Sequence, residues 1–154
     1  MSEATRQIDF YHLVGSDLGA TVAMLSAKII GAGHKALILC VQPMAEPISM
    51  ALWETQPDSF LAHGMGDHMD NPHAPLWLVH DPASNPIAAD YMVMTGGLEP
   101  ADMNSFARLF TLFDGTSETE LTLARQQWKR WSKLEQVKCR YFAQDESGKW
   151  GQKA

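Results

Sequence analysis

Hydrophobic and polar positions alternate along the first third of the chain in a pattern typical of strand, helix, strand and helix in turn. The apolar run at 35–41 is nearly continuous, as in a strand that is buried on both faces. Asp17 stands where it can cap a helix whose apolar residues recur at helical spacing. The elements expected here are a strand at 8–14, a helix that starts after Asp17 and stops at Gly31, a strand at 35–41 and a short helix at 46–54.

The alternation resumes after a loop at 55–74 that is rich in Gly, Pro, Asp and His. The run at 106–113 suits either a helix or a strand, whereas Ser117-x-x-Glu120 has the spacing of a capping box that opens a helix. The other elements expected are strands at 76–80 and 90–94, a helix at 117–134 and a strand at 137–142. This order predicts one three-layer α/β/α domain over residues 1–154, with a mostly parallel sheet and a flexible tail at 144–154.

Composition places the chain among ordinary globular proteins. Its 154 residues are 45% hydrophobic and 19% charged, and no apolar run approaches the roughly 18 residues that a membrane span requires. The first residues lack the basic start and long apolar stretch of a secretory signal. Two cysteines, Cys40 and Cys139, are too few for a disulfide framework. We therefore expect a cytoplasmic protein that does not contact a membrane.

Charge is distributed unevenly. The chain has a net charge of −6, which argues against sequence-independent binding of nucleic-acid phosphates by the protein surface as a whole. Six basic residues and one acid give the segment 125–140 a net charge of +5, so the remaining residues carry −11. A local basic patch on an acidic protein suits a small acidic partner. The alternative is a solvated helix face that has no partner.

Motifs for nucleotide or nucleophile chemistry are missing. The segment at 15–21 follows the first strand, where a phosphate-binding loop would lie, but it lacks the Lys-Ser/Thr of a Walker loop and the glycine spacing of a dinucleotide fingerprint. The sequence has no G-x-S-x-G nucleophile elbow, and neither cysteine has an obvious histidine partner. These observations argue against nucleotide chemistry, and we expect no cofactor.

Histidines and carboxylates in and after the long loop form the one cluster that could bind a metal. The cluster consists of His63, Asp67, His68, Asp70, His73 and His80. Imidazoles and carboxylates are competent zinc ligands, so a small metal-dependent hydrolase is the alternative function. However, the spacing matches no metal-binding signature, and surface or capping histidines are the simpler interpretation. We expect no functional metal.

Four further stretches of the sequence form an ordered set of motifs. They are DFYHL at 9–13, GHKALILC at 33–40, ALW at 51–53 with SFLAH at 59–63, and ARQQWK at 124–129. In this order they resemble the chi subunit family of bacterial DNA polymerase III. The third is the most specific, and together they span most of the chain. Two positions depart from the family pattern, because Ala62 stands where a proline is usual and Trp128 where a tyrosine is commoner.

The resemblance implies a non-catalytic accessory subunit of the clamp-loader assembly. Such subunits bind the psi subunit and the acidic C-terminal tail of single-stranded DNA-binding protein (SSB), which ends in a phenylalanine, so they reach DNA only indirectly. The implied fold is α/β, related in topology to nucleotide hydrolases but without their phosphate-binding loop. The family also places a strand before the last long helix, which favours a strand at 106–113.

Two candidate sites follow from these residues. Helical spacing predicts that Arg125, Lys129 and Lys133 form one basic stripe with Trp128 beside it, which suits an acidic tail that ends in an aromatic ring. By resemblance, a second site for psi or an equivalent partner includes Trp53, Phe60 and His63. The alternative for both sites is that the aromatic residues are simply buried for structural reasons.

Overall fold

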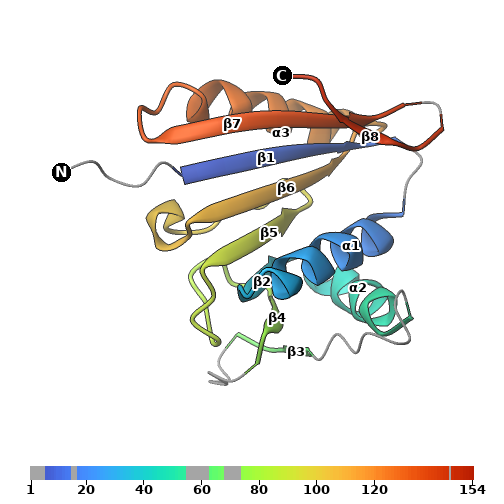
Figure 1. Ribbon diagram of the computed structural model, residues 1–154, viewed down its shortest axis with the longest axis vertical. Helices are drawn as coiled ribbons and strands as arrows, with labels where there is room; N and C mark the ends of the chain where they lie inside the picture. Colours follow the sequence, from blue (N-terminus) through green and yellow to red (C-terminus); the bar gives the residue numbers. More distant parts are fainter. Residues whose placement is uncertain (1–5, 15–16, 55–62, 68–73, 146) are drawn as a thin grey trace.

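The computed structural model describes residues 6–14, 17–54, 63–67, 74–145 and 147–154. Figure 1 shows these residues arranged around one twisted sheet. In chain order the elements are β1 (Arg6–Leu13), α1 (Leu18–Gly31), β2 (Ala36–Leu39), α2 (Gln42–Glu54), β3 (Gly64–Met65), β4 (Leu76–Val79), β5 (Tyr91–Thr95), the 3-10 turn η1 (Met103–Ser105), β6 (Arg108–Asp114), α3 (Glu118–Trp131), β7 (Val137–Gln144) and β8 (Trp150–Gln152).

The described strands form one open sheet in the order β3-β4-β2-β5-β6-β1-β7-β8. Neighbouring strands run parallel except β7 and β8, which are antiparallel. All four residues of β2 are buried, as expected for a central strand with side chains packed on both faces. The predicted α/β fold with a mostly parallel sheet is therefore confirmed.

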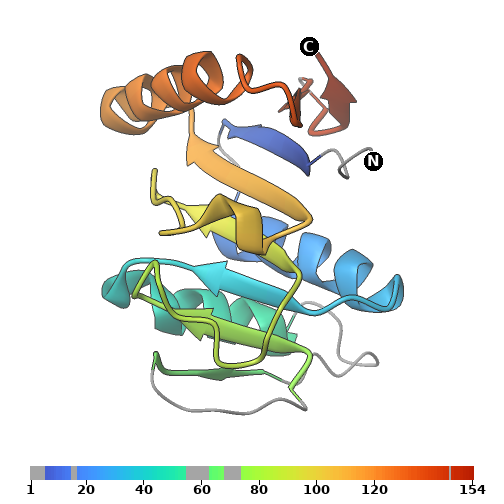
Figure 2. The ribbon, with the colours of Figure 1, turned by 90° about the vertical axis from the view of Figure 1, so that its left-hand side faces the viewer.

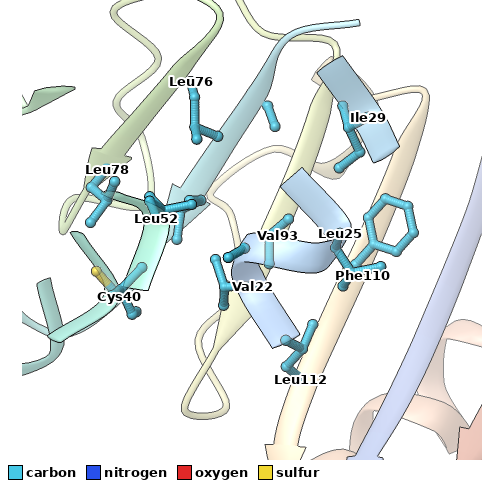
Figure 3. Packing of buried hydrophobic residues seen from close by; sticks show 14 of the residues in the cluster. Val22, Leu25, Ile29, Cys40, Leu52, Leu76, Leu78, Val93, Phe110 and Leu112 are labelled. Atoms are coloured by element: carbon cyan, nitrogen blue, oxygen red, sulfur yellow. The ribbon is translucent and has the colours of Figure 1, made fainter. Parts of the chain in front are cut away.

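Helices lie on both faces of the sheet, which gives three layers. The helices α1 and α2 pack on one face, and α3 packs on the opposite face (Figures 1 and 2). One core lies between the sheet and α1 and α2, and Figure 3 shows its members from helix and strand interdigitating. The second core lies under α3 and includes Phe10, Phe113 and Trp131. The predicted α/β/α layering is thus confirmed.

Local signals explain where two helices begin. The side chain of Asp17 accepts a hydrogen bond from the backbone N–H of Gly19, so the predicted cap of α1 is confirmed. At α3, the Ser117 hydroxyl accepts from the N–H of Glu120, which is one half of the predicted capping box. The other half would require the Glu120 carboxylate to accept a hydrogen bond from the backbone N–H of Ser117. That part of the prediction is wrong, because the carboxylate accepts from the N–H of Asp114 instead.

Several predicted boundaries are corrected by the structure. The helix α2 begins at Gln42 and includes Pro47, whereas we expected it to begin near Pro47. The helix α3 ends at Trp131, because the chain turns there through a hydrogen bond from Leu134 N–H to the Trp131 carbonyl. The ambiguous run at 106–113 is mainly strand β6, as the resemblance implied.

The C-terminal segment contains more regular structure than the sequence pattern indicated. Residues 150–152 form β8, which pairs with β7 and places Trp150 against the core under α1. The flexibility expected of residues 144–154 stays a prediction. None of the helices in the described part of the chain is long and apolar enough to span a membrane.

Candidate functional site

A pocket of about 370 Å³ lies between α3 and the strands beneath it. The helix contributes Arg125 and Trp128, two of the residues that the sequence analysis assigned to this site. The described residues that line it are His12, Phe113, Leu121, Ala124, Arg125, Trp128, Tyr141 and Ala154. The pocket therefore combines an apolar floor, one guanidinium and an indole wall, and we call it the α3 pocket.

Trp128 is half-buried and serves both the core and the pocket. Its ring meets Phe10 edge-on, with centroids 5.2 Å apart, and meets Tyr141 in the same way at 6.0 Å. Such edge-to-face contacts are favourable for aromatic pairs and fix the orientation of the indole. Trp128 therefore packs against core rings and also lines the pocket, and its part in binding a partner stays a prediction.

Two of the three cations on α3 are available to a partner. Arg125 and Lys129 are exposed, and neither makes a hydrogen bond or an ion pair with any residue that the structure describes. By contrast, Arg130 pairs with Glu99 at 2.5 Å and lies over the ring of Trp131. The basic stripe is therefore made by Arg125 and Lys129, four residues apart on α3.

Lys133 does not belong to that helical stripe. It is exposed in the turn that follows α3, two residues beyond the last helical residue, Trp131. The prediction that Arg125, Lys129 and Lys133 continue as i, i+4 positions on one helix is wrong at its last member, because the helix ends before Lys133. Lys133 stays a candidate contact only as a nearby surface cation.

His12 and Tyr141 complete the pocket and were not singled out from the sequence. The His12 Nδ1 and the Tyr141 hydroxyl form a short hydrogen bond of 2.5 Å. Burial lowers the pKa of His12 below its ordinary value of 6.5, and Arg125 lowers it further, whereas Asp114 opposes the shift. His12 is consequently a neutral imidazole at neutral pH. The alternation of β1, which places His12 on the same side as Ile8 and Phe10, was the only signal in the sequence.

Gly115 leaves the space that the His12 imidazole occupies. A Cβ atom added to Gly115 would lie 1.7 Å from the His12 Nε2. Gly115 follows β6, and its N–H donates to the carbonyl of Leu13 at the end of β1. The close approach of these two strand ends therefore leaves room for the imidazole only because residue 115 has no side chain.

The second predicted site is described in part. Trp53, near the end of α2, is 43% exposed, so its side chain is not buried as a core residue. Its ring contacts that of His63, with centroids 4.4 Å apart. The His63 Nε2 also lies 2.7 Å from the Ser49 hydroxyl of α2. The structure thus brings Trp53 and His63 together, whereas Phe60 lies outside the described residues.

The metal alternative gains no support from the parts of the loop that the structure describes. Asp67 accepts hydrogen bonds from the backbone N–H groups of His80 and Asp81. The His80 ring forms a hydrogen bond with the carbonyl of Cys40. These contacts order the strand ends. Within residues 63–67 and 74–80 and the other described segments, no three metal-ligating side chains cluster. His68, Asp70 and His73 lie outside the described residues.

The cysteines are also poorly suited to nucleophilic chemistry. Burial raises the pKa of Cys40 to about 11, and Asp67 adds to the effect. Burial likewise raises the pKa of Cys139 to about 11, with Asp9 contributing. Both thiols are therefore protonated at neutral pH, when a thiolate would be the reactive form.

Comparison with known proteins identifies the family. The sequence model described as DNA polymerase III chi subunit, HolC, matches residues 5–137. The chain belongs to the DNA polymerase III chi subunit family. The matched segment includes all of α3 and its site residues, whereas most of β7 and all of β8 lie beyond it. No curated protein matches the chain.

Proposed function

We propose that this chi-family protein is a non-catalytic accessory subunit of the clamp-loader assembly that binds the acidic C-terminal tail of SSB in the α3 pocket. The observation that carries the proposal is the joint position of Arg125 and Trp128 in the lining of one pocket. Lys129 is exposed on the same helix, one turn further along. We also propose that the protein works in the cytoplasm as part of the polymerase III assembly.

The chemistry of the pocket fits that of the tail. The terminal phenyl ring would enter between Trp128 and the apolar floor, and Arg125 would pair with the terminal carboxylate. The upstream acids would then lie near Lys129 and Lys133. Guanidinium is the strongest side-chain partner for a carboxylate, because it can donate two parallel hydrogen bonds.

The expected affinity is modest. Burial of one phenyl ring stabilises a complex by about 1.5–3 kcal/mol. A charge-assisted hydrogen bond to the carboxylate adds about 1.5–3 kcal/mol, and each exposed ion pair adds about 0–1 kcal/mol. These terms sum to at most about 8 kcal/mol before the cost of ordering the tail is subtracted. A single tail is therefore expected to bind no more tightly than the micromolar range, which corresponds to a binding free energy of about −8 kcal/mol. Several tails on one SSB assembly would raise the apparent affinity through avidity.

Isothermal titration with a synthetic tail peptide tests the proposal. We expect binding of micromolar or lower affinity that weakens as salt is added and is lost when the terminal phenylalanine is removed. The control variant is Arg130→Ala, which removes an equal charge from the same helix but from a residue that pairs with Glu99 outside the pocket. Loss of binding in Arg125→Ala together with normal binding in Arg130→Ala supports the assignment. Absence of binding at low salt contradicts it.

We propose that Trp53, Phe60 and His63 form a second docking surface for psi or an equivalent replisome partner. The support for this is the exposure of Trp53 and its ring contact with His63. Exposed aromatic residues often contribute most of the binding energy at protein interfaces. In a pull-down assay, Trp53→Ala should lose the partner but keep the tail peptide, and a parallel loss of both would show general misfolding instead.

A further inference from the structure

The face of the sheet that carries α1 is only partly covered. Figure 1 shows β6, β1 and β7 crossing the front of the molecule beyond the edge of α1, with no described helix over them. The side chains on this face include those of Asp9 and Tyr11 in β1 and of Arg140 and Phe142 in β7, which pair in register. This open face lies on the side of the sheet opposite the α3 pocket.

Positive charge on the open face exceeds the negative charge that is present to balance it. Asp9 is fully buried, and it accepts hydrogen bonds of 2.8 Å from both Arg108 and Arg140. Two guanidinium groups thus share one carboxylate, and one positive charge is left over. In addition, the buried Nε of Arg108 has no hydrogen-bond partner among the described residues.

A groove of about 330 Å³ runs between this part of the sheet and α1. Lys28, which is exposed near the end of α1, joins Arg108 and Arg140 in its lining, and the described lining residues include no carboxylate. The groove is therefore cationic although the whole chain has a net charge of −6. Charge complementarity indicates an anionic occupant.

Aromatic rings lie next to these cations. Tyr11 stacks on Phe142 with ring centroids 5.1 Å apart, and Trp150 of β8 meets Tyr11 edge-on at 5.0 Å. Tyr91 lines the far end of the same groove. All four rings are half-buried, so each keeps some surface open to a ligand. The guanidinium of Arg140 lies 5.0 Å from the ring centre of Phe142.

We propose that this open face is a contact site for single-stranded nucleic acid, separate from the tail site and independent of it. Alternating phosphates and flat bases match a groove in which cations and aromatic rings lie side by side across several strands. An acidic peptide would use the cations but has no need of so many rings. The protein family belongs to a DNA polymerase assembly, where such strands are present. The site adds a direct contact to the indirect one expected through SSB.

Fluorescence anisotropy with a labelled oligothymidylate of about 15 nucleotides tests this inference on the full chain. Arg108, Arg140 and Lys28 carry three positive charges and Asp9 offsets one, so two remain for phosphate contacts. At about 0.7 per phosphate contact for single strands, the logarithm of the association constant should fall with the logarithm of salt concentration with a slope near −1.4. Lys28→Gln should weaken binding about threefold and reduce that slope by about 0.7. Arg130→Gln removes the same charge from the other layer, at α3, and serves as the matched control.

The outcomes separate the possible occupants. The proposal is supported if Lys28→Gln weakens oligothymidylate binding and Arg130→Gln does not. It is supported further if the oligonucleotide crosslinks to the peptide that contains Phe142. No binding at about 20 mM salt overturns it, and so does equal weakening by both variants. Full competition by inorganic phosphate alone also overturns it, because the rings would then have no role. If the SSB tail peptide instead loses affinity in Lys28→Gln, the open face is a peptide site and the proposal fails.

Discussion

Trp128 of α3 meets Phe10 of β1 edge-on, with ring centroids 5.2 Å apart and planes inclined at 71°. Phe10 is fully buried, so one edge of the indole is anchored in the core while another lines the α3 pocket. Removing Trp128 would therefore change folding and binding together. Arg125, which is exposed and makes no contact of this kind, is the cleaner probe of the site.

The first prediction concerns Arg125→Ala. We expect it to weaken tail-peptide binding by about 10- to 100-fold, because a charge-assisted hydrogen bond of about 1.5–3 kcal/mol is lost. The melting temperature should stay within about 1 °C of the parent protein, since surface substitutions change stability little. Titration calorimetry and a thermal melt on the same samples check both statements. A large drop in melting temperature would show that Arg125 is structural.

A second prediction concerns the protonation of His12. Burial and Arg125 hold the pKa of His12 below 6.5, so the unfolded chain binds this proton more readily than the folded protein. His12 therefore favours the folded state above pH 6.5, and this contribution is lost as the pH falls below that value. An NMR titration should give a pKa below 6.5 for His12, and Arg125→Ala should raise it.

Binding of an anionic tail should raise the same pKa, because the tail carboxylate offsets the field of Arg125. Tail affinity should accordingly increase as the pH falls toward the pKa of His12. In His12→Asn this dependence should disappear. A pH profile of affinity that is unchanged in His12→Asn would place His12 outside the electrostatics of the site.

Gly115→Ala should damage the pocket without altering its charge. The new Cβ would lie 1.7 Å from the His12 Nε2, so the imidazole must move away from its hydrogen bond with Tyr141. We expect weaker tail binding and a loss of stability of about 1–3 kcal/mol from overpacking. Urea unfolding and peptide titration measure the two effects. Gly151→Ala is a suitable control, since an added Cβ there meets no atom within 4 Å.

Asp9→Asn tests the buried carboxylate on the other face. Removing its charge leaves Arg108 and Arg140, which are 33% and 25% exposed, facing each other without compensation. Breaking a fully buried pair costs about 3–5 kcal/mol, and partial exposure of both arginines reduces the expected loss to about 2–3 kcal/mol. Urea unfolding of the variant checks this value. A variant as stable as the parent would show that Asp9 is not needed to hold the two guanidiniums.

Local patterns predicted the parts of the fold that depend on nearby residues. The helical spacing of Arg125 and Trp128 was enough to place both in one pocket, and the continuous apolar run at 35–41 identified the central strand β2. The family resemblance, rather than periodicity, resolved β6, because a run that is buried on both faces has neither a helical nor an alternating pattern.

The remaining features depend on contacts between distant segments. His12 and Tyr141 are 129 residues apart, and only the parallel register of β1 and β7 brings them together. Lys133 was predicted to lie in α3 because no glycine marks the end of that helix in the sequence. The helix ends at Trp131, where the chain turns toward β7. Asp9 can bind two arginines only because β1 lies between β6 and β7 in the sheet, and this strand order could not be predicted from local sequence patterns.

Chemical-shift mapping with the SSB tail peptide on isotope-labelled protein would show whether the tail occupies the α3 pocket. We expect the largest shifts on Arg125, the Trp128 indole and His12, and we expect these shifts to disappear when the peptide lacks its terminal phenylalanine. Shifts confined to other surfaces, or shifts that do not depend on that phenylalanine, would contradict the assignment of the α3 pocket.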